Sequence, residues 1–338
     1  PILRSLPFMN EANITQPQDA ALQETDSGYV ITPEVEGNAL DEDKVISLVK
    51  EAVQNETTEL SLADQDCYLK PTVYQNDEAL NQQMHTLNSL TGAKLTYTVK
   101  GTTSTIDHAV LKSWLVQDEN GNYSIDESKE EEFINQLADQ IDTYGKSRKF
   151  TTHDGAQITL ATNKYGWQVD REKSLEDLKE ALAEGKEQEM ELSYSHKAKG
   201  SGDNDLGDVY VEISIDRQMM WCYKNGQVVV ETPVVTGDIS KAGRATPKNG
   251  CWPIFWKTTE YTMNGPRDEN GTPEYTTFVH YWMPFNGGVG IHDLASRGNN
   301  FGGDIYKTNG SHGCINTPLA AVKTIYETVS VGTPVIVY

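Results

Sequence analysis

One polar segment near the middle of the chain does most to limit how it can fold. Residues 197–208 read Lys-Ala-Lys-Gly-Ser-Gly-Asp-Asn-Asp-Leu-Gly-Asp, and nothing in this stretch can build a core. Glycine, serine and aspartate favour turns and flexible connections over helices and strands. We therefore expect a linker over 201–208 that separates an accessory part, 1–200, from a second domain, 209–338.

The accessory part combines helix and strand patterns. Apolar residues recur at helical spacing in three stretches and alternate with polar residues in two others. The helical stretches contain Leu48 and Val53, Leu80 and Leu87, and Phe133 and Ile141, whereas the alternating stretches are Leu95–Val99 and Met190–Tyr194. Ser174 and Asp177 resemble a capping box, with Gly185 as the helix stop. A helix followed by glycine and a strand occurs twice, so we expect an α+β module that can comprise two lobes.

The sequence pattern of the second domain is typical of a β-rich fold with long loops. Residues 209–215 alternate between apolar and polar side chains, as in a half-buried strand. Asn225-Gly226 predicts a tight hairpin, because both residues tolerate a positive φ. One helix is expected near the end, with Thr317 as its N-cap and Pro318 in its first turn.

The charge of the chain is strongly acidic and uneven. The net charge is −22, and residues 201–338 hold 14 acidic and 10 basic residues, so −18 lies on the first 200 residues. Such acidity argues against binding nucleic acid or anionic lipid through a broad face. No run of apolar residues is long enough to span a bilayer, and the chain opens at Pro1 without a methionine or a signal peptide. We expect a monomer whose membrane anchor lay upstream of Pro1.

Four cysteines are present, and one of them stands in a chemically suggestive context. Cys67, Cys222, Cys251 and Cys314 show no CxxC pair, which argues against a disulfide scaffold. Whether Cys222 and Cys251 pair stays open. For the first three we expect small buried side chains, whereas Cys314 is the candidate nucleophile.

Cys314 lies within Ser311-His312-Gly313-Cys314-Ile315-Asn316, a tight turn just ahead of the predicted last helix. The partial positive charge of a helix N-terminus favours a thiolate, which is the nucleophilic form of cysteine. The backbone N–H groups of Gly313 and Cys314 could bind an oxyanion, and the small Gly313 would let a carbonyl approach. The turn therefore predicts a cysteine acyl-transfer site.

A nucleophilic cysteine needs a base, and two histidines are candidates. His312 lies two residues before Cys314, and His292 ends a predicted strand. A backbone carbonyl or Ser311 could orient His292. A zinc site made by His292, Asp293, His312 and Cys314 is the alternative, but these residues lack metal-ligand spacing, so we expect no metal and no other cofactor.

These motifs resemble the signature of the L,D-transpeptidase catalytic domain over about residues 207–338. Ser-His-Gly-Cys-Ile-Asn follows a strand that ends in Ile-His, and Val234–Gly237, Ala245–Gly250 and the aromatic segment Tyr281–Phe285 precede it in the family's order. Two departures affect the loops beside the site. Asp293-Leu294 follows His292 where the family commonly has glycine, and an insertion lies at Gly298–Gly303.

The resemblance implies a mainly β, sandwich-like catalytic domain that cross-links peptidoglycan. Cys314 would attack the third-residue carbonyl of a donor tetrapeptide stem, release D-alanine and pass the acyl group to an acceptor amine, giving a 3→3 link. The implied site residues are Cys314 as nucleophile, His292 as base, Ser311 and His312 as orienting residues, Gly313 and Cys314 as oxyanion donors, and Trp282, Met283 and Asn316 as substrate contacts.

The same resemblance implies acylation by carbapenem β-lactams and a place at the outer face of the cytoplasmic membrane or in the cell wall. Peptidoglycan stem peptides would be the partners. The accessory part resembles, more loosely, a peptidoglycan-binding module through residues 96–185.

Three other functions remain open from the residues alone. In a cysteine peptidase or carboxypeptidase, water would replace the acceptor amine. A wall-binding protein with an inactive site would not need the intact Cys314 and His292. A sortase-like enzyme would use a Thr-x-x-Cys motif and a later arginine, whereas no arginine follows Cys314.

Overall fold

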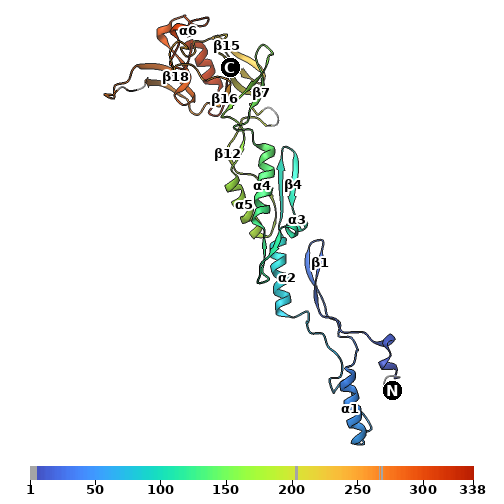
Figure 1. Cartoon of the computed structure of the whole chain (residues 1–338). Helices are drawn as coiled ribbons and strands as arrows, with labels where there is room; N and C mark the ends of the chain where they lie inside the picture. Colours follow the sequence, from blue (N-terminus) through green and yellow to red (C-terminus); the bar gives the residue numbers. More distant parts are fainter. Residues whose placement is uncertain (1–5, 202–204, 266, 268) are drawn as a thin grey trace. The chain divides into compact units, whose positions relative to one another are not determined.

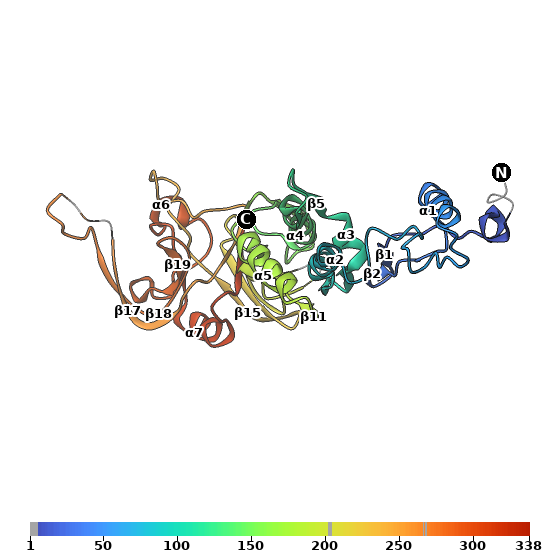
Figure 2. The same cartoon turned by 90° about the horizontal axis from the view of Figure 1, so that it is seen from below.

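The computed structural model describes residues 6–201, 205–265, 267 and 269–338, which form two compact units (Figures 1 and 2). Unit 1 runs to Thr98 and includes Thr103–Glu132 and Leu175–Glu191, whereas unit 2 comprises Val99–Thr102, Phe133–Ser174 and Leu192–Tyr338. No helix in the described residues combines the length and the apolar character that crossing a bilayer requires.

Unit 1 contains the helices nearest the N-terminus and parts of two later helices. They are the 3₁₀ turns η2 (Pro7–Met9) and η3 (Glu11–Asn13), the helices α1 (Glu42–Gln54), α2 (Glu78–Thr91) and α3 (His108–Ser113), most of α5 (Arg171–Glu184) and the start of α4 (Glu127–Ile141). The strands are β1 (Ala21–Thr25), β2 (Gly28–Thr32), β3 (Lys94–Val99), β4 (Thr102–Ile106), β5 (Leu115–Gln117), β6 (Tyr123–Ile125) and β11 (Glu187–Met190).

Capping residues mark where two of these helices begin. Asp41 caps α1 by accepting the Lys44 N–H, and Asp77 caps α2 in the same way. The predicted capping box at Ser174 is wrong, because α5 begins three residues earlier at Arg171 and the Ser174 hydroxyl accepts the Ser193 N–H.

The repeated helix and strand pattern of the accessory part builds one sheet. Strand β3 follows α2, β11 follows α5, and the two strands pair in parallel within the order β11-β3-β4. The prediction of two lobes is therefore corrected, since both copies of the pattern contribute to the same sheet. Leu95, Tyr97 and Val99 alternate into the core, as their pattern predicts.

Unit 2 contains the remaining strands, three helical elements of its own and the rest of α4 and α5. The strands are β7 (Arg148–Thr151), β8 (Gln157–Leu160), β9 (Thr162–Asn163), β10 (Gln168–Val169), β12 (Tyr194–His196), β13 (Val209–Ser214), β14 (Met219–Lys224), β15 (Gln227–Pro233), β16 (Gly250–Pro253), β17 (Thr258–Asn264), β18 (Thr276–Asn286), β19 (Val289–Asp293), β20 (Ile315–Thr317) and β21 (Pro334–Val337). The helical elements are η4 (Ala295–Arg297), α6 (Tyr306–Asn309) and α7 (Leu319–Thr328).

Two sheets and a shared core make unit 2 a mainly β, sandwich-like domain, as the resemblance implies. One sheet has the order β15-β14-β13-β21-β16-β9, and the other has the order β17-β18-β19-β20. Buried side chains from both sheets and from α7 form one cluster that includes Val211, Met220, Met283, Ile291 and Val322. The hairpin of β14 and β15 turns at Asn225 and Gly226, whose φ angles of 52° and 74° confirm the predicted turn.

The expectation that residues 197–208 bury nothing is wrong for the described part of this segment. Ala198 and Leu206 are buried in a cluster with Phe150, Cys251 and Ile336, and residues 202–204 lie outside the described residues. Burial is possible because the segment packs against residues that follow β9, the edge strand beside β16: the Tyr165 hydroxyl accepts the Lys199 N–H, and the Trp167 indole donates to the Gly200 carbonyl.

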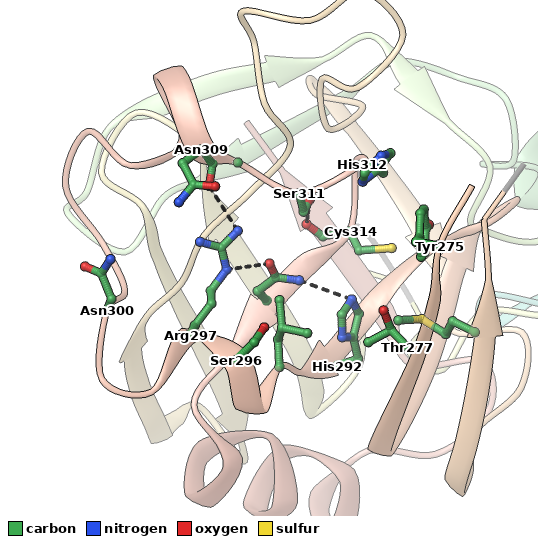
Figure 3. A pocket seen from close by; sticks show the side chains of 14 residues that line it. Tyr275, Thr277, His292, Ser296, Arg297, Asn300, Asn309, Ser311, His312 and Cys314 are labelled. Carbon is green, nitrogen blue, oxygen red and sulfur yellow. Dashed lines mark hydrogen bonds between the residues drawn. The ribbon is translucent and has the colours of Figure 1, made fainter. Parts of the chain in front are cut away.

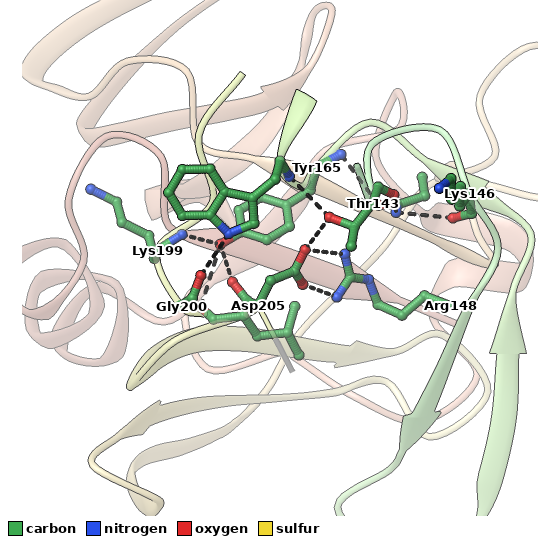
Figure 4. A network of polar contacts seen from close by, with 10 residues as sticks. Thr143, Lys146, Arg148, Tyr165, Lys199, Gly200 and Asp205 are labelled. Carbon is green, nitrogen blue, oxygen red and sulfur yellow. Dashed lines mark hydrogen bonds and ion pairs between the residues drawn. The ribbon is translucent and has the colours of Figure 1, made fainter. Parts of the chain in front are cut away.

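One polar residue of this segment, Asp205, is buried within an ion pair and several hydrogen bonds (Figure 4). Asp205 is 1% exposed, and its carboxylate accepts hydrogen bonds from the Arg148 guanidinium and the Thr143 hydroxyl. The Tyr165 hydroxyl donates to the Asp205 carbonyl at 2.9 Å. A buried carboxylate is tolerated when it is paired and hydrogen-bonded in this way, and composition alone does not reveal that pairing.

Candidate active site

The pairing of β19 with β20 places the candidate nucleophile beside the candidate base. The two strands are parallel, and His292 lies opposite Asn316. Cys314 lies two residues before Asn316, and residues at that spacing in an extended chain face the same way. The structure therefore gathers Cys314, His292 and Asn316 on one face (Figure 3).

The turn that presents Cys314 is fixed by side-chain hydrogen bonds. The Ser311 hydroxyl donates to the Cys314 carbonyl at 2.6 Å and accepts the Gly313 N–H at 3.0 Å. The Thr246 hydroxyl donates to the Gly313 carbonyl at 2.7 Å and accepts the Gly237 N–H at 2.8 Å. Gly313 has a φ of 115°, a conformation that only glycine adopts without strain.

The turn borders a pocket of about 390 Å³ that exposes both candidate groups (Figure 3). Its lining comes from β17, β18, the end of β19, the η4 loop and the Cys314 turn, and consists of Met263, Tyr275, Thr277, His292, Leu294, Ser296, Arg297, Asn300, Asn309, Gly310, Ser311, His312, Cys314 and Asn316. The hairpin of β17 and β18 extends beyond the rest of its sheet (Figure 2).

A chain of hydrogen bonds assigns the protonation of His292. Arg297 can only donate, so its contact of 2.7 Å with Asn316 identifies Oδ1 as the acceptor there. The Asn316 Nδ2 group then donates to His292 Nε2 at 3.2 Å, and His292 Nδ1 donates to the Asp293 carbonyl at 2.7 Å. Nε2 is therefore the unprotonated nitrogen, as a base requires.

Burial keeps this imidazole neutral. His292 is 3% exposed, and burial is the main reason why its pKa falls to about 4, with the Arg297 charge acting in the same direction. The Asp293 carbonyl is the orienting partner of His292. Ser311 does not have that role, because its hydroxyl is committed to the Cys314 carbonyl and the Gly313 N–H.

Cys314 rests as a thiol. Burial raises its pKa to about 11, opposed by a hydrogen bond from the Gly290 backbone. The expected thiolate at a helix N-terminus is wrong, because α7 begins at Leu319 with Pro318 as its N-cap and β20 separates it from Cys314. The helix dipole acts within about one turn, and Cys314 is too far along the chain to benefit.

These protonation states predict how Cys314 reacts with a simple alkylating agent. Iodoacetamide attacks the thiolate, so alkylation should be slow near neutral pH and should accelerate about tenfold per pH unit up to a pKa of about 11. Intact-mass time courses across this range measure the rate. A rate that levels off near neutrality would instead reveal a preformed pair of thiolate and imidazolium.

Three other predicted site residues lie at different depths around the reacting groups. Met283 is fully buried in the core and does not line the pocket. Trp282 packs behind Cys314, and its ring centre lies 5.6 Å from that of His292. His312 faces the β18 side of the pocket, with Nε2 at 3.5 Å from Glu274 and its ring 4.6 Å from that of Tyr275.

The predicted oxyanion donors differ in availability. The Gly313 N–H already donates to the Ser311 hydroxyl, so it is not a free donor in this structure. The glycine is needed for the backbone angle of the turn and for the close approach of Val289, whose Cγ2 atom would lie 3.3 Å from an added Cβ.

Asp293 does not join the reacting groups. Its carboxylate accepts the backbone N–H groups of His280 and Tyr281 at 2.8 and 2.9 Å, and it contacts His280 Nδ1 at 2.8 Å. Strand alternation directs it to the face opposite that of His292. Within the described residues, no group of three or more His, Cys, Asp or Glu side chains is placed to hold a metal ion.

The sequence did not identify the residues that complete the pocket. Arg297 ends η4 and Asn300 lies in the insertion at Gly298–Gly303, and the sequence showed only that the segment between His292 and Ser311 is unusually long. Met263, Tyr275 and Thr277 come from the long hairpin, and no motif marks them. These three side chains reach the pocket because β17 pairs with β18 beside the Cys314 turn, and the sequence does not show that packing.

Comparisons with known proteins agree with this arrangement. The model of the L,D-transpeptidase catalytic domain matches residues 208–337, and that of a peptidoglycan binding domain matches 73–191. A comparison with curated proteins finds no match.

Two solved structures resemble most of the chain. A cysteine-to-serine mutant of an Enterococcus faecium L,D-transpeptidase is 32% identical, and the match covers 76% of this chain and 100% of that chain with a TM-score of 0.57. An avibactam carbamoyl enzyme is also 32% identical, and the match covers 77% of this chain and 98% of that chain with a TM-score of 0.58. With a thiol and a neutral imidazole on one face of a pocket, and with this likeness along most of its length, the chain belongs to the L,D-transpeptidase family of cysteine-dependent acyltransferases.

Proposed function

We propose that this enzyme forms 3→3 cross-links between peptidoglycan stems through an acyl-enzyme on Cys314. The observation that carries the proposal is the unprotonated Nε2 of His292 on the same face as the Cys314 thiol, with both groups lining one pocket. The peptidoglycan binding domain associates the chain with the cell wall and its polymer.

In the first step, Cys314 Sγ bonds to the carbonyl carbon of the third residue of a donor tetrapeptide stem. His292 Nε2 takes the thiol proton, displacing the Asn316 hydrogen bond at that nitrogen. The bond to the terminal D-alanine then breaks, and the proton passes from His292 to the departing amine. A thioester remains on Cys314, and the imidazole is neutral again.

In the second step, the amine of an acceptor stem attacks the thioester carbonyl. His292 removes the proton that this amine loses, and the departing sulfur takes the proton back as the cross-link leaves. The thiol and the imidazole return to their resting forms. We assign the oxyanion contact in both steps to the Cys314 N–H, because the Gly313 N–H is engaged by Ser311.

The resting thiol explains why base and nucleophile must act together. A pKa of about 11 leaves very little thiolate near neutral pH, so proton transfer to His292 has to accompany attack. A His292 pKa of about 4 keeps the base unprotonated over most of the pH range. We further propose that unit 1, which contains most of the residues matched by the peptidoglycan binding domain, holds the catalytic domain on the wall polymer.

Purified disaccharide-tetrapeptides test the proposal. Incubation with the enzyme should give dimers joined between third residues, together with one free D-alanine per link, and tandem mass spectrometry identifies the bond. The matched control is the Cys314→Ala protein with the same substrate. Trimmed tripeptide monomers without dimers would favour the carboxypeptidase alternative, in which water is the acceptor.

A further inference from the structure

The pocket contains a cation without an acidic partner. Arg297 lines it near Cys314 and His292, and none of the described lining residues is an aspartate or a glutamate. Among the residues that the structure describes, Arg297 meets no carboxylate, and desolvation alone shifts its pKa, downward. A half-buried guanidinium without a counter-charge favours the binding of an anion, and the rest of the chain is strongly acidic.

The guanidinium is held in a fixed orientation (Figure 3). Its Nε donates to Asn316 Oδ1 at 2.7 Å, and one Nη2 hydrogen is donated to the Asn309 carbonyl at 3.1 Å. Of the five N–H groups of an arginine, three remain for a ligand in the pocket. A planar fork with this pattern suits the two oxygens of a carboxylate.

The hydrogen-bond chain also sets where such a carboxylate would lie. Arg297 contacts Asn316, which in turn contacts the Nε2 atom of His292. In the proposed reaction, the scissile carbonyl sits at Cys314 and the leaving residue follows it. The carboxyl carbon of a terminal residue lies three bonds beyond that carbonyl carbon, at less than about 3.8 Å. Arg297 is linked to the base through Asn316, so it lies at the end of the pocket where His292 would protonate the leaving amine. The carboxylate of the leaving residue would lie at that same end.

We propose that Arg297 binds the free carboxylate of the leaving residue and thereby selects donor stems that end one residue after the scissile bond. This inference rests on the proposed function. A donor with a further residue presents a neutral amide at the same place, which leaves the half-buried guanidinium without a counter-charge. Arg297 is thus a specificity-determining residue as well as the group that orients Asn316.

Two matched donor peptides test the inference: a tetrapeptide stem with a free terminal carboxylate and the same stem as its carboxamide. Binding is measured by calorimetry on the Cys314→Ala protein, in which no acyl transfer occurs, and kcat/KM is measured on the enzyme with Cys314 intact. We expect the acid to be preferred about 10- to 100-fold in both measurements, as a charge-assisted hydrogen bond pair provides. Arg297→Gln should bring the two peptides close to equality, and Arg297→Lys should retain part of the preference.

The ratio of acid to amide separates recognition from a general structural effect. Loss of the Asn316 contact in Arg297→Gln would slow both peptides alike and leave their ratio unchanged, which would overturn the inference. The matched control is Arg217→Gln, which removes a partly exposed arginine outside the pocket and should keep the full preference.

The two readouts distinguish the two proposals. Preferential binding of the acid without any cross-linking by the enzyme would reject the proposed function and keep the carboxylate site. Cross-linking with equal binding and equal turnover of acid and amide would keep the function and reject the role of Arg297.

Discussion

The Cys314→Ala protein is expected to lose cross-linking by about 10⁴-fold or more while it stays folded. The thiol is the only group in the pocket that the proposed chemistry uses as a nucleophile, so no other side chain can form the thioester. Cys314 is 8% exposed at the edge of the core, and removing its sulfur should destabilise the protein by only about 1 kcal/mol. Dimer formation from tetrapeptide stems measures the first effect, and thermal unfolding measures the second.

The same variant should also fail to react with a carbapenem. The strained lactam carbonyl would acylate the Cys314 thiol as a stem carbonyl does. Intact mass should show one drug mass on each wild-type chain and none on Cys314→Ala. Cross-linking that persists in Cys314→Ala would reject the mechanism.

The remaining cysteines provide matched controls. Cys222 and Cys251 are fully buried, and burial raises the pKa of each thiol to about 12. Neither lines the pocket, and Cys67 is buried in unit 1. Cys222→Ala, Cys251→Ala and Cys67→Ala should keep turnover and the drug adduct, although the small cavities that they leave can lower stability.

The second large effect is expected from His292→Gln, which should reduce turnover by about 10²- to 10⁴-fold, as the loss of a general base does. Glutamine is of similar length and polar, but it cannot take up a proton. Without the base, the rate should depend on the thiolate fraction and rise about tenfold per pH unit toward the Cys314 pKa of about 11. The wild-type rate should be much flatter, because His292 with a pKa of about 4 is already neutral.

His280→Gln is the control for this variant, since it changes the same residue type on the neighbouring strand. His280 contacts the Asp293 carboxylate, is half exposed and does not line the pocket. We expect His280→Gln to keep the wild-type rate and its pH profile. If His292→Gln retained the wild-type profile as well, His292 would not be the base, and His312 would have to be tested next.

Local patterns in the sequence predicted several parts of the molecule correctly. Asn225-Gly226 indicates a hairpin because the required backbone angles are properties of those two residues. The apolar residues from Val209 onward indicate the strand β13, although Glu212 and Ser214 are buried as well, so the expectation of a half-buried strand is wrong. The motif from Ser311 to Asn316 marks the turn for the same reason, since Gly313 and the Ser311 hydroxyl shape it within a few residues.

Other features depend on what the chain brings together from a distance. Residues 197–208 are polar in composition, yet Asp205 is buried because Arg148, more than fifty residues earlier, neutralises it. Met283 belongs to the aromatic segment of the motif, but the pleat of β18 turns it into the core. The linear sequence shows neither which residue pairs with Asp205 nor which face of β18 carries Met283.

The sequence by itself determined the family, the candidate nucleophile and its candidate base, because the residues that mark them lie within a short turn and at the end of one strand. Only the tertiary structure decided their protonation and their surroundings. Burial sets Cys314 as a thiol and His292 as a neutral base, and the pairing of β19 with β20 places Asn316 between His292 and Arg297. Desolvation and hydrogen-bond partners arise from contacts between distant segments, so no stretch of the sequence contains them.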